Sequence, residues 1–254
     1  MEKQRVTDVG LLVVGDELLL GRRSDKHFPW ALAYFSTIGV DLRWVNYVGD
    51  DEALLIETFR AIQGRGDVCF SFGGIGATPD DLTRQAMAAA HDRPLALHAE
   101  AVRMIEQQFG RDAYPNRILM AELPEGADLI PNAFNNIPGF SIGTIFCLPG
   151  FPEMAWPMLE WVMATRFQTS IGLRQRFAAV AVPDVRESEL IGLLAETQRH
   201  FADIKVSSLP RFPQGGRWLV ELGVRGPDES VRQAMDWLRC ELERRGLAVR
   251  EIGG

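Results

Sequence analysis

The chain has 254 residues, of which 46% are hydrophobic, and it carries a formal net charge of −7. This length suffices for one large domain or two smaller ones with buried cores, so it excludes a minimal module stapled by disulfides. Three cysteines, at positions 69, 147 and 240, show no C-x-x-C spacing and predict neither a disulfide framework nor a cysteine zinc site. The composition is typical of a globular protein in a reducing compartment, which we expect to be cytoplasmic.

The negative charge is concentrated in the first two thirds of the chain. Residues 1–170 carry −8, whereas residues 171–254 carry +1. Neither part has the basic excess that neutralises nucleic-acid phosphates. The first apolar run meets Asp16 and Glu17 too early to span a membrane. We therefore expect neither a nucleic-acid nor a membrane partner. An anionic ligand on the acidic part would need local hydrogen-bond donors or a bridging cation.

Apolar and amphipathic segments alternate through the first part of the chain. The continuous apolar run 9–14 predicts a buried strand, and Phe28, Leu32 and Phe35 predict a helix over 24–38. Further segments predict strands at 41–48 and 67–72, helices at 51–63, 80–90, 99–109 and 152–166, and a hairpin over 140–148, with a proline- and asparagine-rich stretch at 114–138. Because helices separate the strands, we predict an α/β domain with a mostly parallel sheet.

A second patterned region follows the polar, glycine-containing segment at 167–174. This segment predicts a boundary between domains at 1–170 and 171–254. Beyond it, strands are predicted at 176–182, 204–209, 218–224 and 247–252, with helices at 187–201 and 228–245. The order β-α-β-β-α-β is the split βαβ arrangement of ferredoxin-like domains, so we predict a smaller α+β domain here.

Residues 67–83, DVCFSFGGIGATPDDLT, run from a predicted strand through a glycine loop into a helix. Gly73, Gly74 and Gly76 permit positive φ and a close approach to a ligand, and the helix start offers N–H groups to an anion. The loop lacks the spacing of a P-loop and of the dinucleotide fingerprint. A plain strand-to-helix turn explains the same residues, so an anion cradle and a turn both remain open.

The start of that helix has a complete capping signature. Thr78 suits the N-cap, Pro79 suits the first helical position, and Asp81 completes a capping box. We therefore expect the helix to begin at Asp80.

Acidic residues follow the predicted strands. Asp16 and Glu17 follow the first strand, Asp50 follows the second, and Asp80 with Asp81 follow the glycine loop. Because ligands of open α/β sheets bind outside the carboxyl ends of strands, we expect these side chains to converge. Carboxylates beside an anion cradle call for an Mg²⁺-like ion between them. The predicted metal ligands are Asp16, Asp50, Asp80 and Asp81. Capping of the next helix is the alternative role for Asp50 and its neighbour.

Seven motifs in fixed order resemble one known family. They are Gly15–Gly21, Val48–Asp50, Gly73–Thr83, Pro115–Arg117, Leu123–Ala127, Ile137–Gly139 and Leu148–Gly150. Over residues 7–166 they resemble the MoaB/Mog molybdopterin-binding domain family, most closely the amino-terminal region of the competence/damage-inducible CinA proteins. The remaining residues resemble the smaller α+β domain that follows in CinA-type proteins.

The resemblance implies a three-layer α/β domain that binds a pterin or nucleotide phosphate at the glycine loop. It implies Asp50 and Asp81 as catalytic carboxylates and molybdopterin as a ligand. It also implies an alternative activity, the hydrolysis of ADP-ribose with a divalent metal as cofactor. The expected ligand-binding residues are Gly15, Asp16, Glu17, Asp25, Gly73, Gly74, Gly76, Thr78, Pro149 and Gly150.

Two positions depart from the family pattern. Ala77 stands where the family usually has proline, and His27 where it often has asparagine. His27 is expected either to donate to phosphate or to mark a site that has lost its task. The separate deamidase domain of full-length CinA proteins needs about 150 further residues, so we expect no nicotinamide-nucleotide deamidation.

Three functions stay open from the sequence. The first is a pterin- or nucleotide-binding protein, the second a divalent-metal ADP-ribose pyrophosphatase, and the third a non-catalytic assembly protein. We expect a homo-oligomer.

Overall fold

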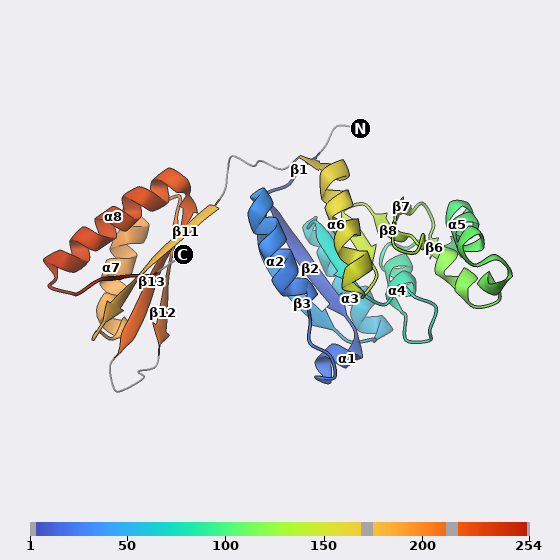
Figure 1. Ribbon diagram of the computed structural model, residues 1–254, viewed down its shortest axis with the longest axis horizontal. Helices are drawn as coiled ribbons and strands as arrows, with labels where there is room; N and C mark the ends of the chain where they lie inside the picture. Colours follow the sequence, from blue (N-terminus) through green and yellow to red (C-terminus); the bar gives the residue numbers. More distant parts are fainter. Residues whose placement is uncertain (1–3, 169–174, 212–217, 253–254) are drawn as a thin grey trace. The chain divides into compact units, whose positions relative to one another are not determined.

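The computed structural model describes residues 4–168, 175–211 and 218–252. The chain divides into two compact units, Met1–Ser170 and Ile171–Gly254, which are described separately (Figure 1). Most of the predicted boundary segment, residues 169–174, lies outside the described residues.

A six-stranded sheet forms the centre of the first unit. Its strands are β2 (Asp8–Val14), β3 (Asp41–Val48), β4 (Cys69–Phe72), β7 (Asp128–Ile130), β8 (Gly139–Ile142) and β9 (Ile145–Leu148). They lie in the order β3-β2-β4-β9-β8-β7, in which β3, β2, β4 and β9 are parallel and β8 and β7 are antiparallel to their neighbours. The predicted mostly parallel sheet is confirmed.

Helices cover both faces of this sheet. They are α1 (Asp16–Leu19), α2 (His27–Ile38), α3 (Glu52–Arg65), α4 (Thr83–Ala90), α5 (Ala99–Phe109) and α6 (Pro152–Arg166). Successive side chains of β2 point to opposite faces, so Leu12 packs in one core with Phe59 of α3 and Leu11 packs in the other with Phe35 of α2. The result is the three-layer α/β arrangement, with α2 and α6 on one face and α3 and α4 on the other (Figure 1).

Short elements complete the first unit. They are the parallel pair β1 (Gln4–Arg5) and β10 (Phe167–Gln168), the antiparallel pair β5 (Leu95–Leu97) and β6 (Glu122–Pro124), and the 3₁₀ turns η1 (Gly110–Ala113) and η2 (Arg117–Ala121). The proline- and asparagine-rich stretch at 114–138 therefore contains regular structure in η2, β6 and β7.

The predicted start of the helix after the glycine loop is wrong. α4 begins at Thr83, and no side chain caps it from Leu82. The Asp81 carboxylate instead accepts hydrogen bonds from the N–H and the hydroxyl of Thr78, at 2.8 and 2.5 Å. The residues of the capping signature form a turn that precedes the helix. Within this turn the Asp81 carboxylate accepts the N–H and the hydroxyl of Thr78, and the hydrogen bonds of α4 begin only after it.

The helix predicted over 24–38 also begins later, at His27. Asp25 accepts hydrogen bonds from the N–H groups of His27 and Phe28, at 2.8 and 2.9 Å. These two N–H groups have no partner within the helix, so the Asp25 carboxylate satisfies the helix start.

The second unit is a four-stranded sheet with two helices. Its elements are β11 (Gln175–Pro183), α7 (Glu187–His200), β12 (Lys205–Arg211), β13 (Leu219–Pro227), α8 (Asp228–Arg244) and β14 (Arg250–Glu251). The order β12-β13-β11-β14 is antiparallel throughout and places β13 between β11 and β12, which confirms the predicted split βαβ arrangement. Val180, Leu222 and Leu238 belong to a core of its own. Within the described residues, no helix has the length and apolar character that a bilayer crossing requires.

Candidate functional site

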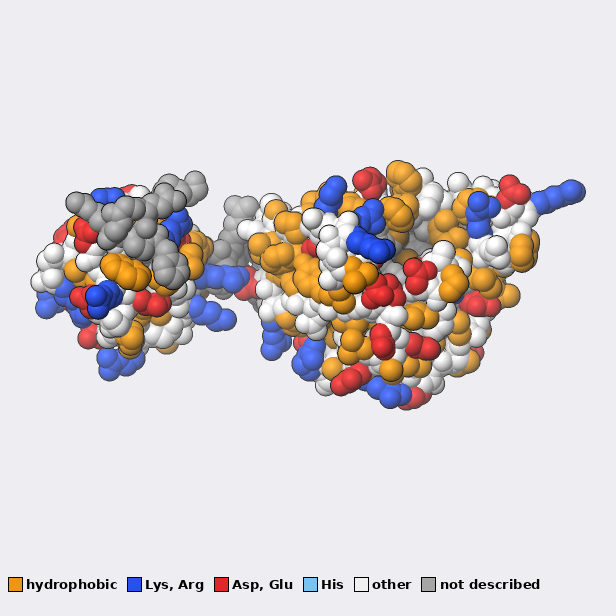
Figure 2. Space-filling model, turned by 90° about the horizontal axis from the view of Figure 1, so that it is seen from below, with side chains coloured by type: hydrophobic (Ala, Val, Ile, Leu, Met, Phe, Trp, Pro, Cys, Tyr) orange, Lys and Arg blue, Asp and Glu red, His pale blue; other side chains and the backbone are white. Residues whose placement is uncertain are grey.

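A cavity of about 610 Å³ opens where β2, β4 and β9 end. The predicted site residues that line it are Gly15, Glu17, Asp50, Gly73, Gly74, Gly76, Thr78, Asp80, Asp81, Pro149 and Gly150. Figure 2 views the lower end of Figure 1, where acidic side chains gather around a hollow in the first unit. The strand ends thus bring most of the predicted residues to one place. Asp16 lies outside this lining, and Asp25 lines a separate, smaller cavity.

The glycine loop, defined here as residues 73–78, leaves no room for side chains at its glycines. Gly74 has φ +68°, and a Cβ there would lie 2.3 Å from the Thr83 hydroxyl oxygen. A Cβ at Gly73 would lie 2.4 Å from the carbonyl oxygen of Val14. Gly76 has no positive φ, but a Cβ there would lie 2.4 Å from the Asp81 carboxylate. Backbone conformation and close packing therefore favour glycine at positions 73 and 74, and a side chain at position 76 would displace the Asp81 carboxylate.

The carbonyl groups of the glycine loop are tied into the protein. Gly73 O accepts the Thr83 hydroxyl at 2.9 Å, and Gly74 O accepts the Thr83 N–H at 2.9 Å. Gly76 O accepts a hydrogen bond from Arg84 at 2.8 Å. The N–H of Thr83, the first residue of α4, is therefore used within the protein.

Four consecutive N–H groups in the glycine loop have no protein acceptor. In the part of the chain that the structure describes, no hydrogen bond is donated by the N–H of Gly74, Ile75, Gly76 or Ala77. All four residues line the large cavity. Successive free N–H groups around a concave surface form an anion-binding nest.

Arg84, which was not predicted from the sequence, holds this loop in place. Its side chain is buried and donates to the carbonyl oxygens of Leu119 and Glu122, at 2.5 and 3.0 Å, as well as to Gly76. Burial lowers the pKa of Arg84, while the charges of Glu122 and Asp81 act in the opposite direction. The one available signal was a basic residue in a helix that is otherwise rich in alanine.

Asp16 and Asp50 join the ends of β2 and β3. The Asp50 carboxylate accepts the N–H of Asp16 at 2.9 Å, and the Asp16 carboxylate accepts the N–H of Asp50 at 3.2 Å. Burial raises the pKa of Asp50, and the charges of Asp16, Glu17 and Asp80 raise it further, whereas the Asp16 N–H lowers it. The N-cap of α3 is the neighbouring Asp51, which accepts the Leu54 N–H at 2.9 Å.

The predicted metal site does not form. Among the described residues, no group of three or more His, Cys, Asp or Glu side chains is placed to hold a metal ion. One oxygen of Asp16 and one of Asp50 accept backbone N–H groups, and an oxygen of Asp81 accepts two bonds from Thr78. The predicted set was Asp16, Asp50, Asp80 and Asp81. Asp16, Asp50 and Asp81 hold neighbouring N–H and hydroxyl groups instead, and the described carboxylates do not gather as a divalent ion requires.

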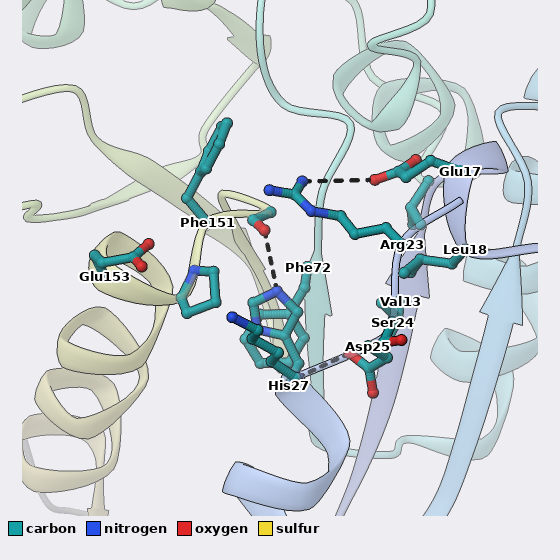
Figure 3. A pocket seen from close by; sticks show the side chains of 14 residues that line it. Val13, Glu17, Leu18, Arg23, Ser24, Asp25, His27, Phe72, Phe151 and Glu153 are labelled. Carbon is teal, nitrogen blue, oxygen red and sulfur yellow. Dashed lines mark hydrogen bonds and ion pairs between the residues drawn. The ribbon is translucent and has the colours of Figure 1, made fainter. Parts of the chain in front are cut away.

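A smaller cavity of about 180 Å³ adjoins the large one and shares Glu17, Arg23 and Phe151 with it (Figure 3). Asp25 lines this cavity, but its carboxylate already accepts the N–H groups at the start of α2 and the Tyr47 hydroxyl at 2.8 Å. Burial, together with the hydrogen bond to Asp25, raises the pKa of Tyr47 to about 12. Asp25 therefore fixes the wall of the small cavity.

His27 fastens the segment after β9 to the start of α2. Its Nε2 lies 3.2 Å from Gly150 O, and its ring stacks on Phe72 with the ring centroids 4.2 Å apart. A carbonyl oxygen only accepts, so Nε2 carries the proton, and among the described residues Nδ1 has no partner. Burial lowers the pKa of His27, which keeps the ring neutral. The expectation that His27 donates to phosphate is wrong, because its donor is used by Gly150.

Apolar and amide side chains line another part of the large cavity. They belong to Met120, Asn132, Asn135, Ile137, Phe151 and Met154. Asn132 donates to Asn135 at 2.8 Å and to Ile137 O at 3.0 Å, which braces the loop before β8. None of these residues was predicted to bind the ligand, although Met120, Asn132, Asn135 and Ile137 lie in the proline- and asparagine-rich stretch.

A family model described as a probable molybdopterin binding domain matches residues 10–169. This chain belongs to that family. A CinA-like protein of Anaeromyxobacter sp. strain Fw109-5 is 34% identical over 200 residues, which cover 76% of this chain and 46% of that protein. A CinA-like protein of Anaeromyxobacter dehalogenans strain 2CP-C is 32% identical over 237 residues, which cover 89% and 57%. The chain thus spans about half the length of these relatives.

Among solved structures, the protein CinA from Thermoplasma acidophilum, described as having unknown function, is similar to this family member. The TM-score is 0.58 and the identity 27%, over 63% of this chain and 97% of that one. The resemblance drawn from the sequence motifs is confirmed.

Proposed function

We propose that this protein binds a phosphate-bearing pterin or nucleotide, with the phosphate seated on the glycine loop. The observation that carries the proposal is the run of four consecutive residues, Gly74 to Ala77, that line the cavity and whose N–H groups have no acceptor among the described residues. Such a run recognises an anion through partial positive charge and hydrogen bonds. Membership of the probable molybdopterin-binding family supports a phosphate-bearing pterin of the molybdopterin type.

The remaining cavity suits a flat ring attached to that phosphate. Its volume of about 610 Å³ lies within the range of small-molecule sites. Met120, Phe151 and Met154 offer apolar and aromatic surface in the lining of the cavity. Sulfur and aromatic groups pack well against planar rings, so phosphate and ring have separate surfaces in one cavity.

Asp81 and Asp50 have positioning roles in this proposal. Asp81 holds Thr78 and thereby the end of the glycine loop, and Asp50 holds the backbone that follows β2. The catalytic roles predicted for these two residues apply only if the protein carries out a reaction. The proposed binding involves no reaction.

The test is calorimetry with molybdopterin, ADP-ribose and AMP, each beside a partner without phosphate, namely the dephosphorylated pterin and adenosine. We expect binding of at least one phosphorylated compound and at least a tenfold weaker signal, about 1.4 kcal/mol, from its unphosphorylated partner. A folded sample that binds none of the phosphorylated compounds, or binds both partners equally, refutes the proposal.

Two other functions that the sequence predicts are alternatives to binding alone, and each has its own experiment. Hydrolysis of ADP-ribose is checked by AMP release with Mg²⁺ or Mn²⁺, but the described carboxylates of the cavity do not fit such an ion. A purely assembling role, together with the expected homo-oligomer, is checked by the mass of the protein in solution with and without ligand.

A further inference from the structure

Negative charge in the lining of the large cavity opposes the binding of an anion, and the N–H groups of the glycine loop do not fully offset it. Glu17, Asp50, Asp80 and Asp81 all line it. The pKa of Asp50 is raised by burial and by three neighbouring carboxylates, which shows that the negative charges interact. A phosphate group adds one or two further negative charges, and like charges at close range repel. Binding therefore requires a positive charge nearby.

The cavity lining includes one basic side chain among its described residues, Arg23. Arg23 also lines the small cavity, so it stands in the wall that the two cavities share. In Figure 3 its guanidinium extends between Glu17 and Phe151. The Arg23 Cζ lies 5.5 Å from the centroid of the Phe151 ring.

The guanidinium of Arg23 is held only loosely. Its Nη1 lies 4.0 Å from Glu17 Oε1, which is too far for a hydrogen bond. Its side chain is 54% exposed, and such a surface ion pair contributes little. Among the described residues, none accepts a hydrogen bond from the Arg23 side chain. Arg23 thus keeps its donors for a ligand.

We propose that Arg23 clamps the phosphate against the glycine loop, so that this site takes a phosphate monoester without a divalent metal. The inference rests on the proposed function, since it assumes a phosphate-bearing ligand. A guanidinium offers two parallel N–H donors that match two phosphate oxygens, and it leaves Glu17 for the more highly charged partner. One guanidinium and four backbone N–H groups match a single phosphate group. A diphosphate carries more charge, and the described lining of this cavity offers no second cation to neutralise it.

Neighbouring arginines supply a matched control. Arg22 is adjacent in sequence, exposed, and absent from the described lining of either cavity. Arg23→Gln and Arg22→Gln therefore remove the same charge, and only the first removes a donor from the cavity. Glu17→Gln removes the competing anion and leaves Arg23 in place.

The experiment is a titration of the whole protein with inorganic phosphate and with AMP, followed by phosphorus NMR, in EDTA and again in Mg²⁺. We expect the same affinity in both buffers. Arg23→Gln weakens binding by about tenfold or more, as expected for the loss of a charge-assisted hydrogen bond. Arg22→Gln changes it by less than about threefold, because an exposed charge at that distance is screened. Glu17→Gln tightens binding.

Two results overturn the inference while the proposed function stands. One is binding that appears only with Mg²⁺. The other is equal weakening by Arg23→Gln and Arg22→Gln, which shows a general charge effect without a clamp. If the wild-type protein binds neither inorganic phosphate nor AMP in either buffer, the inference fails, and if it also binds neither molybdopterin nor ADP-ribose, the proposed function itself fails.

Discussion

At the scale of single residues, buried polar side chains hold together the backbone segments that form the site. Arg84 bridges three backbone carbonyls, and His27 joins the start of α2 to Gly150. Neither residue belonged to a motif that predicts such a role, because their partners are carbonyl groups far away in the sequence. Motif reasoning found residues whose types are informative, chiefly glycine and aspartate. It could not find residues whose role depends on the packed fold.

Arg84→Met tests the support of the glycine loop. The variant keeps an apolar side chain but leaves carbonyl oxygens of Gly76, Leu119 and Glu122 without this donor. We expect the free energy of unfolding to fall by about 2–4 kcal/mol and ligand affinity to fall with it. Urea denaturation and calorimetry measure the two effects.

Arg60→Met is the control for this variant. Arg60 is exposed and makes a 3.6 Å ion pair with Asp92, so we expect a change within about 0.5 kcal/mol. Equal destabilisation by the two variants would contradict a special role for Arg84.

Because of His27, we expect the free energy of unfolding to depend on pH. Burial lowers its pKa below the ordinary 6.5, although the Gly150 carbonyl and the Asp25 charge oppose this. The unfolded chain therefore takes up the proton first as the pH falls. The contribution to stability is complete above pH 6.5 and is lost toward lower pH, at no more than about 1.4 kcal/mol per pH unit.

The measurement is urea denaturation at several pH values between 7.5 and 5. His27→Asn offers an amide donor to Gly150 and removes the titration, so its stability should fall less steeply. His91 needs its own variant, because burial lowers its pKa as well. Identical pH profiles for wild type and His27→Asn would argue against this role.

At the scale of elements, the hydrophobic pattern predicted the strands and helices well, but it placed the start of α2 too early, and a capping signature did the same for α4. Period-2 and period-3.6 patterns reflect burial, which the three-layer fold preserves. Capping signals describe only which N–H groups a side chain can satisfy. Asp81 satisfies Thr78 in a turn, so α4 begins three residues later than predicted. Local hydrogen bonding allowed both outcomes, and packing of the glycine loop against Thr83 selected one.

Gly74→Ala tests the glycine loop against a control with the same backbone. Gly74 and Gly66 have φ +68° and +69°, so alanine strains both by about 1 kcal/mol. Only at Gly74 does the added methyl group meet another atom, the Thr83 hydroxyl at 2.3 Å, whereas Gly66 faces open space. We expect Gly74→Ala to lose phosphate binding and Gly66→Ala to retain it, as measured by calorimetry. Equal affinities would show that the loop is not the phosphate site.

At the scale of the whole molecule, each unit has a separate core, and every residue of the candidate site belongs to the first unit. Four of the acidic residues in 1–170, Glu17, Asp50, Asp80 and Asp81, line the site for which the sequence predicts a bridging cation. The carboxylates were correctly expected at the strand ends, but their ligands are backbone N–H groups. The composition could show that an anionic ligand would meet an acidic part of the chain. It could not show which side chain offsets this charge.

Leu222→Ala tests the independence of the two units. Leu222 is fully buried in the core of the second unit, so the cavity left behind should destabilise that unit by about 2–5 kcal/mol. Ligand affinity should remain unchanged, since no described residue of the large cavity lies in the second unit. Calorimetric unfolding with and without ligand separates the two effects. A parallel loss of affinity would show that the second unit contributes to the site.

In the proposed complex, the N–H groups of Gly74, Ile75, Gly76 and Ala77 receive the phosphate of the ligand. The most direct measurement is the backbone amide NMR spectrum during titration with AMP and with adenosine. We expect large, saturable shifts of these four amide resonances with AMP and none with adenosine. Saturable binding of AMP that leaves all four resonances in place, while amides elsewhere move, would contradict the proposed complex.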